Sequence, residues 1–563
     1  MSSIAEITAT LTAPGAPFEM GEVEIRGRSV RIWKNCPLTL PAVLEVMRGH
    51  GELPFLVYQD ERLSYAEHDR RVTALAAALV ADFGVKKGDR VAIAMRNYPD
   101  WVVAFWATVQ IGAVAVPLNA WWTANELQYG LKDSGSQVLI ADGERAERLR
   151  QHLAGFGLRA MITARGDTSN AGSIDFDALL ARYQSAPLPQ VPIAPEDDAT
   201  IFYTSGTTGS PKGAVGSHRN IATNIFSLLF CRARATLRDG GELPDPDAPG
   251  PKKATLLAVP FFHVTGCHSA MLSGAYAGNK VVLMHKWDAD RALELIADEG
   301  ITGFGGVPAI AWQVLEHPKR QAFDLSSVEY VAYGGAPAAP ELVSRIGEVF
   351  PAALSANGYG MTETSSLAAQ NMGSDYLAKP DSIGPLIPVC DGRVVGEDGA
   401  DVDGGVGELW IRGPNVVRGY WNKPEETAET FVDGWLRTGD LVRCDDEGFI
   451  YVLDRAKDML IRGGENVYCV EVEDALYSHP AVMDAAVIGL PHMILGEEVG
   501  AMVQVTPEAD VKTEDLMAQV AGRLAAFKVP VRIELLSEPL PRNANGKILK
   551  SEIRDRMIGN IDS

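Results

Sequence analysis

The sequence has few positive charges for its length. Lysine and arginine together number 51 against 73 aspartates and glutamates, so the 563-residue chain carries a formal net charge of -22. Nucleic-acid binding requires a basic face that neutralises phosphates, and this balance excludes nucleic acid as an expected partner. Any phosphate-bearing ligand must therefore be held by local donors and not by the overall field of the protein.

Cysteines are also scarce, and long apolar runs are missing. The six cysteines are scattered without a C-x-x-C pair, which offers neither a zinc site nor a disulfide framework and favours a reducing compartment. The N-terminus lacks a basic segment followed by an apolar run, and no stretch approaches the roughly 18 apolar residues of a membrane span. We therefore expect a soluble cytoplasmic protein; a homodimer and a peripheral membrane contact stay open.

Strand and helix patterns alternate through much of the chain. Helices expected at 99–111 and 124–132 separate apolar strands, which is typical of parallel sheets covered by helices on both faces. Residues 1–40 are expected to form an arm on the main body, and 238–253, rich in Pro, Gly and Asp, an exposed insertion. The expected strands of this α/β region are 90–95, 114–118, 137–140, 199–202, 255–260, 280–284, 301–307 and 328–334.

The sequence pattern changes after about residue 385. Short strands and tight turns predict a β-rich lobe, with a hairpin formed by 441–444 and 449–453. Residues 458–560 are expected to form a small α+β unit. Its elements are a helix at 470–478, strands near 484–489 and 498–505, and a helix capped by Thr513. We predict a large domain over 1–454, a hinge at 455–457 and a small C-terminal domain over 458–563.

The stretch 203–213, YTSGTTGSPKG, follows the buried strand 199–202. Within eleven residues it holds five Ser or Thr hydroxyls, three glycines and Lys212. Glycines let backbone N–H groups close around an anion, and the hydroxyls and the lysine add donors and charge. A polar surface loop is the alternative interpretation. A Walker A loop is excluded, because two residues separate Gly209 from Lys212.

The full YTSGTTGSPKG match resembles the adenylate-forming superfamily of acyl-CoA synthetases, luciferases and peptide-synthetase adenylation domains, and the resemblance is greatest to fatty-acyl-CoA synthetases. It runs from about residue 60 to 550 and implies a small C-terminal domain that is mobile. It implies ATP, Mg²⁺ and coenzyme A as cofactors and a small carboxylic acid as substrate. The loop residues that it assigns to ATP are Thr204, Ser205, Gly206, Thr207, Thr208, Gly209 and Lys212.

Other motifs follow in the family's order. By resemblance, Tyr359 stacks on adenine, Glu363 and Thr204 hold Mg²⁺, and Asp440 accepts from the ribose with Arg455 nearby. Glu363 suits that role because it is a hard oxygen donor. A strand-to-turn connection with a solvated glutamate is the alternative for this segment. The remaining ATP-binding residues implied by the resemblance are Gly334, Gly335, Ala336, Pro337, Asn357, Gly358, Gly360, Met361 and Thr362.

The resemblance also implies residues for each half-reaction. Lys547 is the adenylating lysine, since a cation offsets the repulsion when a carboxylate attacks the α-phosphate, and Lys457 is the hinge residue. The loop Gly463, Gly464 and Glu465 lines the route of the CoA thiol, although Cys469 stands where many relatives carry proline. Lysines in such loops are otherwise mostly solvated. The implied acyl pocket consists of His263, Gly305, Gly306, Val307 and Gly358, with His263 as an aromatic gate on an apolar strand.

The sequence therefore predicts an acid–thiol ligase of the acyl-CoA synthetase type. Amino-acid adenylation is disfavoured because residues 264–269 include no acid to hold an α-ammonium, and the chain ends soon after Lys547 without a carrier domain. An acyl-AMP ligase that delivers to a carrier protein, a luciferase-like oxygenase and an inactive nucleotide-binding protein remain as rivals. Medium- or long-chain fatty acids lead the expected substrates, followed by aryl and steroid-side-chain acids. Trp121 and Trp122 have no assigned role.

Overall fold

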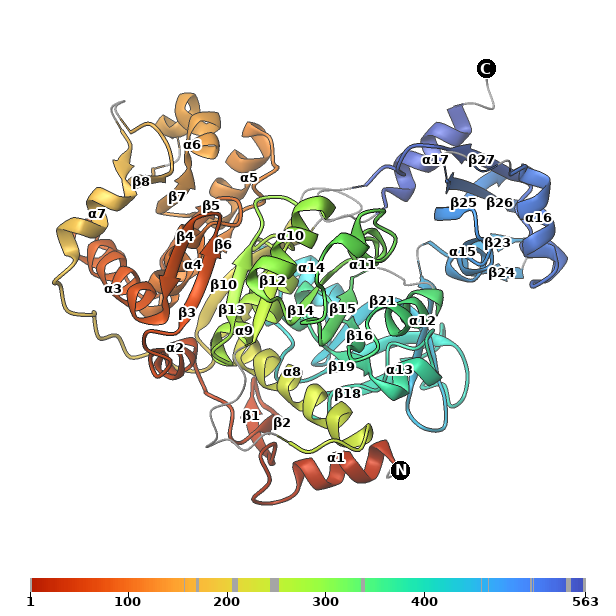
Figure 1. Ribbon diagram of the computed structural model, residues 1–563, viewed down its shortest axis with the longest axis horizontal. Helices are drawn as coiled ribbons and strands as arrows, with labels where there is room; N and C mark the ends of the chain where they lie inside the picture. The colour runs from red at the N-terminus through yellow and green to blue at the C-terminus, as the bar shows by residue number, and fades with distance from the viewer. Residues whose placement is uncertain are drawn as a thin grey trace.

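The structure is a computed structural model that describes residues 3–155, 157–168, 172–204, 211–243, 253–335, 340–456, 458–463, 465–506, 509, 511–542 and 548–559. It shows a large body of helix-covered sheets, a β-rich lobe and a small C-terminal unit drawn in blue at the upper right of Figure 1. This arrangement confirms the predicted α/β fold class. Residues 244–252 of the expected insertion lie outside the described residues.

The first large sheet is parallel except at its β10–β11 edge. Its strands are near-continuous apolar runs because helices cover both faces, among them α3 (Tyr65–Ala81), α4 (Pro99–Gln110), α5 (Ala124–Ser134) and α6 (Gly143–Leu149). The strand order is β11 (Lys212–Ser217), β10 (Asp198–Thr204), β6 (Val114–Pro117), β5 (Arg90–Ala94), β7 (Val138–Asp142), β8 (Ala160–Ala164) and β9 (Ile174–Asp175).

The second large sheet is parallel in its centre and antiparallel at both edges. The helices α10 (Ala289–Glu299), α11 (Pro308–Leu315) and α12 (Pro340–Val349) connect its central strands. The strand order is β17 (Ala369–Met372), β16 (Leu354–Tyr359), β15 (Tyr330–Gly334), β14 (Gly303–Gly306), β12 (Ala254–Leu257), β13 (Lys280–Leu283), β3 (Pro54–Tyr58) and β4 (Glu61–Ser64).

Several strands are shorter than expected. The strand predicted to reach Pro260 ends at Leu257, because the Pro260 carbonyl instead accepts the His263 N–H in a turn. The strand predicted over 301–307 begins at Gly303, because the Ile301 N–H closes the end of α10. It stops at Gly306, since Val307 is the N-cap of α11 with a proline at the first turn.

The long helix α8 (His218–Arg238) lies below the second sheet in the view of Figure 1, and the N-terminal arm packs against it. The arm consists of α1 (Ile4–Thr12), β1 (Met20–Ile25) and β2 (Arg28–Trp33). Trp33 is buried against Phe230 of α8, with ring centroids 5.2 Å apart. The arm packs on the main body, as expected.

The β-rich lobe is antiparallel and includes the predicted hairpin, with β21 (Trp435–Cys444) paired to β22 (Ile450–Arg455). Its other strands are β18 (Asp391–Val395), β19 (Gly407–Arg412) and β20 (Phe431–Val432).

The C-terminal unit packs α15 (Cys469–Tyr477), α16 (Thr513–Ala521) and α17 (Lys550–Gly559) on one sheet. The expectation that Thr513 caps α16 is wrong by one residue. Lys512 is the N-cap, because its N–H donates to the Asp515 carboxylate at 3.1 Å. The strand order is β24 (Glu465–Val467), β23 (Leu460–Arg462), β26 (Gly496–Val505) and β25 (Val482–His492), and β27 (Arg532–Leu536) pairs with β26.

Candidate active site

The YTSGTTGSPKG stretch connects β10 to β11, the edge strand of the first sheet. Thr204, the last residue of β10, pairs with Lys212, the first residue of β11, and the Thr204 hydroxyl lies 3.4 Å from the Lys212 carbonyl. The carboxyl end of β10 is where ligands gather in sheets of this kind. The five residues between them that were assigned to ATP, Ser205, Gly206, Thr207, Thr208 and Gly209, lie outside the described residues.

The carboxyl ends of β15 and β16 form a wall that only glycine permits. Gly334 and Gly358 are register partners, and a Cβ on Gly334 would lie 2.3 Å from the Gly358 carbonyl. A Cβ on Gly360 would lie 1.5 Å from the Ser366 carbonyl. Gly335 has a φ of +74°. The wall is therefore flat and presents backbone, as a planar ligand requires, whereas Ala336 and Pro337 lie outside the described residues.

Tyr359, Asp440 and Arg455 meet beside this wall. The Tyr359 hydroxyl donates to the Asp440 carboxylate at 2.5 Å, and the Arg455 guanidinium pairs with the same carboxylate at 2.6 Å. Burial, followed by the Asp440 charge, raises the pKa of Tyr359 well above its usual value, so the phenol stays a donor. The structure thus brings together three residues that lie up to 96 positions apart in the sequence.

Glu363 lies in the short helix η4 (Thr362–Thr364), which contacts β10. The Tyr420 hydroxyl donates to Glu363 Oε1 at 2.6 Å, and the Lys212 ammonium lies 5.2 Å from the centre of the Tyr420 ring. Tyr420 therefore connects the glutamate to the lysine of the signature stretch. Sequence reasoning missed Tyr420, which lies 57 residues from its partner in no recognisable motif.

The other residues that were predicted to bind ATP in this segment lie on β16 and on the turn between β16 and η4. Asn357 is on β16 opposite Asn371, and Met361 and Thr362 lead into η4, where the Met361 N–H donates to the Thr364 hydroxyl at 2.9 Å. Within the described residues no group of three His, Cys, Asp or Glu side chains could hold a metal alone.

A cavity of about 240 Å³ opens from the glycine wall. It lies between the face of the second sheet formed by β12, β14, β15 and β16 and the segment of α8 and the π-helix η2 (Thr265–Leu272). Its lining includes the predicted residues Gly305, Gly306 and Gly358, together with Gly334, Gly335 and Tyr359 of the wall. Adenylate and acyl sites would therefore be continuous.

Two residues assigned to the acyl pocket, His263 and Val307, are not in the lining of this cavity. His263 also lies in a turn before η2 and not on a strand, because its N–H closes back on Pro260. Its ring meets Phe262 edge-on with centroids 4.6 Å apart.

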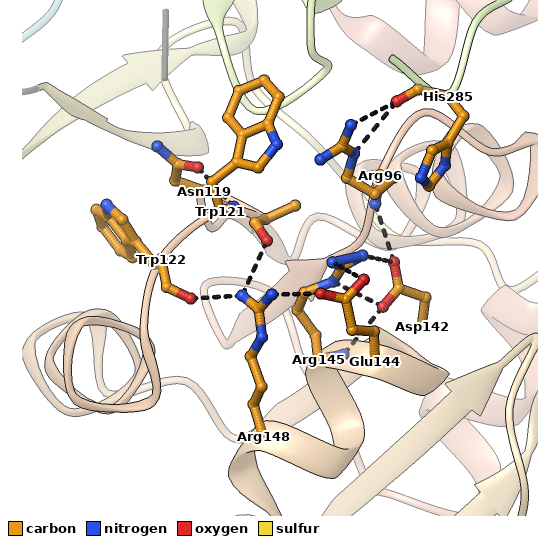
Figure 2. A network of polar contacts seen from close by, with 10 residues as sticks. Arg96, Asn119, Trp121, Trp122, Asp142, Glu144, Arg145, Arg148 and His285 are labelled. Atoms are coloured by element: carbon orange, nitrogen blue, oxygen red, sulfur yellow. Dashed lines mark hydrogen bonds and ion pairs between the residues drawn. The ribbon is translucent and has the colours of Figure 1, made fainter. Parts of the chain in front are cut away.

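The Trp121 and Trp122 pair belongs to a polar network at the carboxyl ends of β5 and β7 (Figure 2). Arg96 lies 4.7 Å from the centre of the Trp121 ring, and Trp121 meets Phe262 edge-on at 5.0 Å. Beneath them, the buried Arg145 guanidinium makes two hydrogen bonds to Asp142, at 2.7 and 2.8 Å. Through the contact of Trp121 with Phe262, the network connects the carboxyl edge of the first sheet to the segment that holds His263. No sequence pattern indicated this connection.

The residues assigned to CoA belong to the C-terminal unit. Gly463 has a φ of +61° and donates its N–H to the Leu495 carbonyl at 2.8 Å, and Glu465 begins β24 with an exposed side chain. Lys457, Gly464 and Lys547 lie outside the described residues.

The sequence of this chain matches the models of two protein families. The model of the AMP-binding enzyme family matches residues 44–421, and the model of the AMP-binding enzyme C-terminal domain matches residues 471–547. The chain belongs to the AMP-binding enzyme family. It is an AMP-forming acyl-CoA synthetase, which activates a carboxylic acid with ATP as an acyl adenylate, transfers the acyl group to CoA and releases AMP and pyrophosphate.

Among its relatives are a feruloyl-CoA synthase of Amycolatopsis and a long-chain-fatty-acid–CoA ligase of Mycobacterium tuberculosis. The first is 37% identical over 88% of this chain and 94% of its own; the second is 34% identical over 89% and 94%. An anthranilate CoA ligase solved with anthranoyl-AMP has a TM-score of 0.82 at 24% identity over 94% of this chain and 99% of its own, which shows the shared fold.

The CoA ligases of this family use ATP, Mg²⁺ and CoA. The described residues fit these ligands: a flat glycine wall suits a base, the Asp440 carboxylate suits hydroxyls, and Glu363 offers a hard oxygen for Mg²⁺. Across the part of the chain that the structure describes, no helix is both long and apolar enough to cross a membrane.

Proposed function

We propose that the acid is a medium- or long-chain fatty acid whose apolar body occupies the cavity beneath η2. The observation that carries this proposal is the shape of the cavity. It follows β15 from Gly334 at the adenylate end to Tyr330 at the other, about 13 Å at ~3.3 Å per residue. Leucines of α8 and β12 and Met372 of β17 line it.

In this proposal the large domain holds ATP. The glycine wall and Tyr359 contact the adenine, Asp440 accepts from the ribose, and Thr204 and Glu363 hold Mg²⁺ on the phosphates. Lys547 offsets the charge of the carboxylate as it attacks the α-phosphate, which produces acyl-AMP and pyrophosphate. The CoA thiol then attacks the acyl carbon, and AMP leaves. Both steps depend on positioning and charge, without a covalent nucleophile from the protein.

Between the two steps we propose that the C-terminal unit, residues 458–563, rotates about Lys457 relative to residues 1–454, with 455–457 as the hinge. Contacts at the start of the hinge support this division. Arg455 pairs with Asp440 of the lobe, whereas the adjacent Asp454 accepts the N–H of Cys469 in the C-terminal unit. Successive residues thus anchor the chain to different parts of the molecule.

The cytoplasm is the proposed location. Its support is that all six cysteines are free in the structure, which suits a reducing compartment.

The proposed substrate class is tested with a panel of carboxylates assayed for pyrophosphate release. We expect kcat/KM to rise with chain length among alkanoic acids, because each methylene that enters the cavity leaves water. A flat dependence on chain length, with faster turnover of short aryl acids, would contradict the fatty-acid proposal.

Aryl and steroid-side-chain acids are the second candidate class. The strand β14 favours them, because Gly303, Gly305 and Gly306 present backbone to the cavity, a flat surface against which a ring can lie. The feruloyl-CoA synthase among the relatives points in the same direction.

Amino acids should be poorer substrates than their deaminated analogues. The described residues that line the cavity include no carboxylate, and burial lowers the pKa of His268 in the 264–269 segment to about 4, so it stays neutral. A buried α-ammonium would therefore have no partner, which is costly. Pyrophosphate release with phenylalanine and with 3-phenylpropanoate measures the difference directly. A higher kcat/KM for the amino acid would overturn this assignment.

Glu363→Gln should weaken Mg²⁺ binding and lower the rate of adenylation, since it removes a hard anionic ligand. Raising Mg²⁺ should then recover part of the rate. Tyr420→Phe is the matched control, because it removes the hydrogen bond to Glu363 but keeps the carboxylate. Titration of initial rate against Mg²⁺ should shift for Glu363→Gln much more than for the control. An unshifted titration in Glu363→Gln would exclude the metal role.

A further inference from the structure

The cavity beneath η2 is apolar in its middle and polar at the end farthest from the glycine wall. Leu257 of β12 and Ala332 of β15 line the middle. Thr255 and Tyr330 lie two residues earlier on the same two strands, line the cavity and are both register partners of Gly303. Because the glycine wall lies at the carboxyl end of β15, this polar row lies at the far end of the cavity.

An arginine of α8 lines the cavity at this far end. Arg232 is exposed, and its guanidinium lies 6.0 Å from the centre of the Tyr330 ring. It is the only charged residue among the described lining residues of the cavity. Within the described residues, its guanidinium makes neither an ion pair nor a hydrogen bond. The far end of the cavity therefore offers an accessible cation that lacks a counter-ion there.

Two neutral side chains at the same end also lack partners. Asn279 precedes β13, whose first residue pairs with Ala254 next to Thr255. Across the part of the chain that the structure describes, the Asn279 amide and the Thr255 hydroxyl make no hydrogen bond, and both residues are half-buried. Nearer the glycine wall, by contrast, the Ser269 and Ser366 hydroxyls bond each other at 2.7 Å. A guanidinium with amide and hydroxyl donors suits an oxygen anion.

We propose that Arg232, with Asn279 and Thr255, binds a second carboxylate at the far end of the acyl chain, so that the preferred substrate is an α,ω-dicarboxylic acid. This inference rests on the proposed function, since it places the acyl chain in this cavity. The apolar chain covers Leu257 and Ala332, while the second carboxylate keeps part of its water at the exposed end. A carboxylate fits better than a neutral acceptor, because it accepts two parallel N–H donors and balances the charge of the guanidinium.

The preference should depend on chain length, because β15 fixes the distance between the two ends of the cavity. A diacid that is too short would leave its second carboxylate among Leu228, Leu229 and Leu257, and burying an unpaired charge is costly. Short diacids should therefore be poorer substrates than monoacids of equal length. The preference should appear only when the chain spans from Gly334 to Tyr330, about 13 Å at ~3.3 Å per residue.

The experiment compares pyrophosphate release for straight-chain monoacids and diacids of equal carbon number over a series of lengths. After correction for its two equivalent ends, one diacid should be preferred by the wild-type protein by about 5- to 10-fold in kcat/KM. This range lies between the contributions of an exposed ion pair and of a buried charged hydrogen bond. Added salt should weaken the preference, because salt screens an exposed pair, and should affect the monoacid much less.

Three variants assign the preference to the arginine. Arg232→Met should abolish it, by lowering kcat/KM for the diacid more than for the monoacid. Arg232→Glu should reverse it, so that an acid with an ammonium group at its far end becomes better than the diacid. Arg443→Met is the matched control, because Arg443 is also exposed, lies 3.8 Å from the centre of the Tyr451 ring and is not in the described cavity lining. Its preference should equal that of the wild type.

Each outcome has one meaning. Equal kcat/KM for monoacids and diacids at every length in the wild type overturns this inference, leaves the proposed function intact and makes Arg232 a solvated surface charge. A preference that persists in Arg232→Met, or that Arg443→Met reduces equally, also overturns it. Absence of acid-dependent pyrophosphate release with every acid overturns the proposed function and this inference together.

Discussion

Lys547→Ala should slow formation of the acyl adenylate by on the order of 10²–10³, while thioester formation from supplied acyl-AMP stays nearly unchanged. The reason is electrostatic. The carboxylate and the α-phosphate are both anionic, and a positioned cation stabilises the charge that accumulates as they approach. In the second step the acyl group is already activated, so the lysine is no longer needed.

The measurement is single-turnover kinetics of each half-reaction. Lys512→Ala is the control, because it removes an exposed lysine of the same C-terminal unit while the backbone N–H that bonds Asp515 remains. Equal slowing of both half-reactions in Lys547→Ala would show that the lysine serves the fold or both steps, and would contradict the assigned role.

Gly464→Leu should have the opposite effect. By the family resemblance, position 464 faces the passage of pantetheine, and a leucine side chain would obstruct it. We expect the thioester step to fall by on the order of 10² or more, as the loss of one positioned contact near the reacting centre can cost that much. Adenylation should be close to wild type, because under the proposed rotation this loop would lie away from ATP while the adenylate forms.

Gly464→Ala provides a graded comparison, since a methyl group blocks less of the passage than an isobutyl group. CoA-dependent release of AMP from preformed acyl-AMP should decrease from Gly to Ala to Leu. Slowing confined to adenylation would contradict the proposed rotation of the C-terminal unit about Lys457.

The sequence predicted the order of strands and helices well, because each element has a local signal. The strands 90–95 and 114–118 are apolar runs between turn residues, and the structure places β5 and β6 there. Strand ends were less accurate, because they depend on contacts with distant residues. Ile301 was expected in a strand, but its N–H completes the end of α10.

In the candidate site, too, residues with a local role could be predicted and residues that depend on distant partners could not. Gly360 could be found from its motif, since its role is local: a side chain there would meet the nearby backbone of Ser366. Tyr420 could not, because it acts through Glu363, a partner that only the folded chain brings next to it. Trp121 was unexplained for the same reason, since its partners are Arg96 and Phe262.

The most direct test of the whole account is the stoichiometry of products from one incubation. The purified protein with ATP, Mg²⁺ and an accepted carboxylic acid should form acyl-AMP and pyrophosphate in equal amounts, and added CoA should convert the adenylate to acyl-CoA and AMP, as followed by liquid chromatography and mass spectrometry. Formation of ADP and phosphate, or of acyl-CoA without an acyl-AMP that CoA consumes, would contradict it.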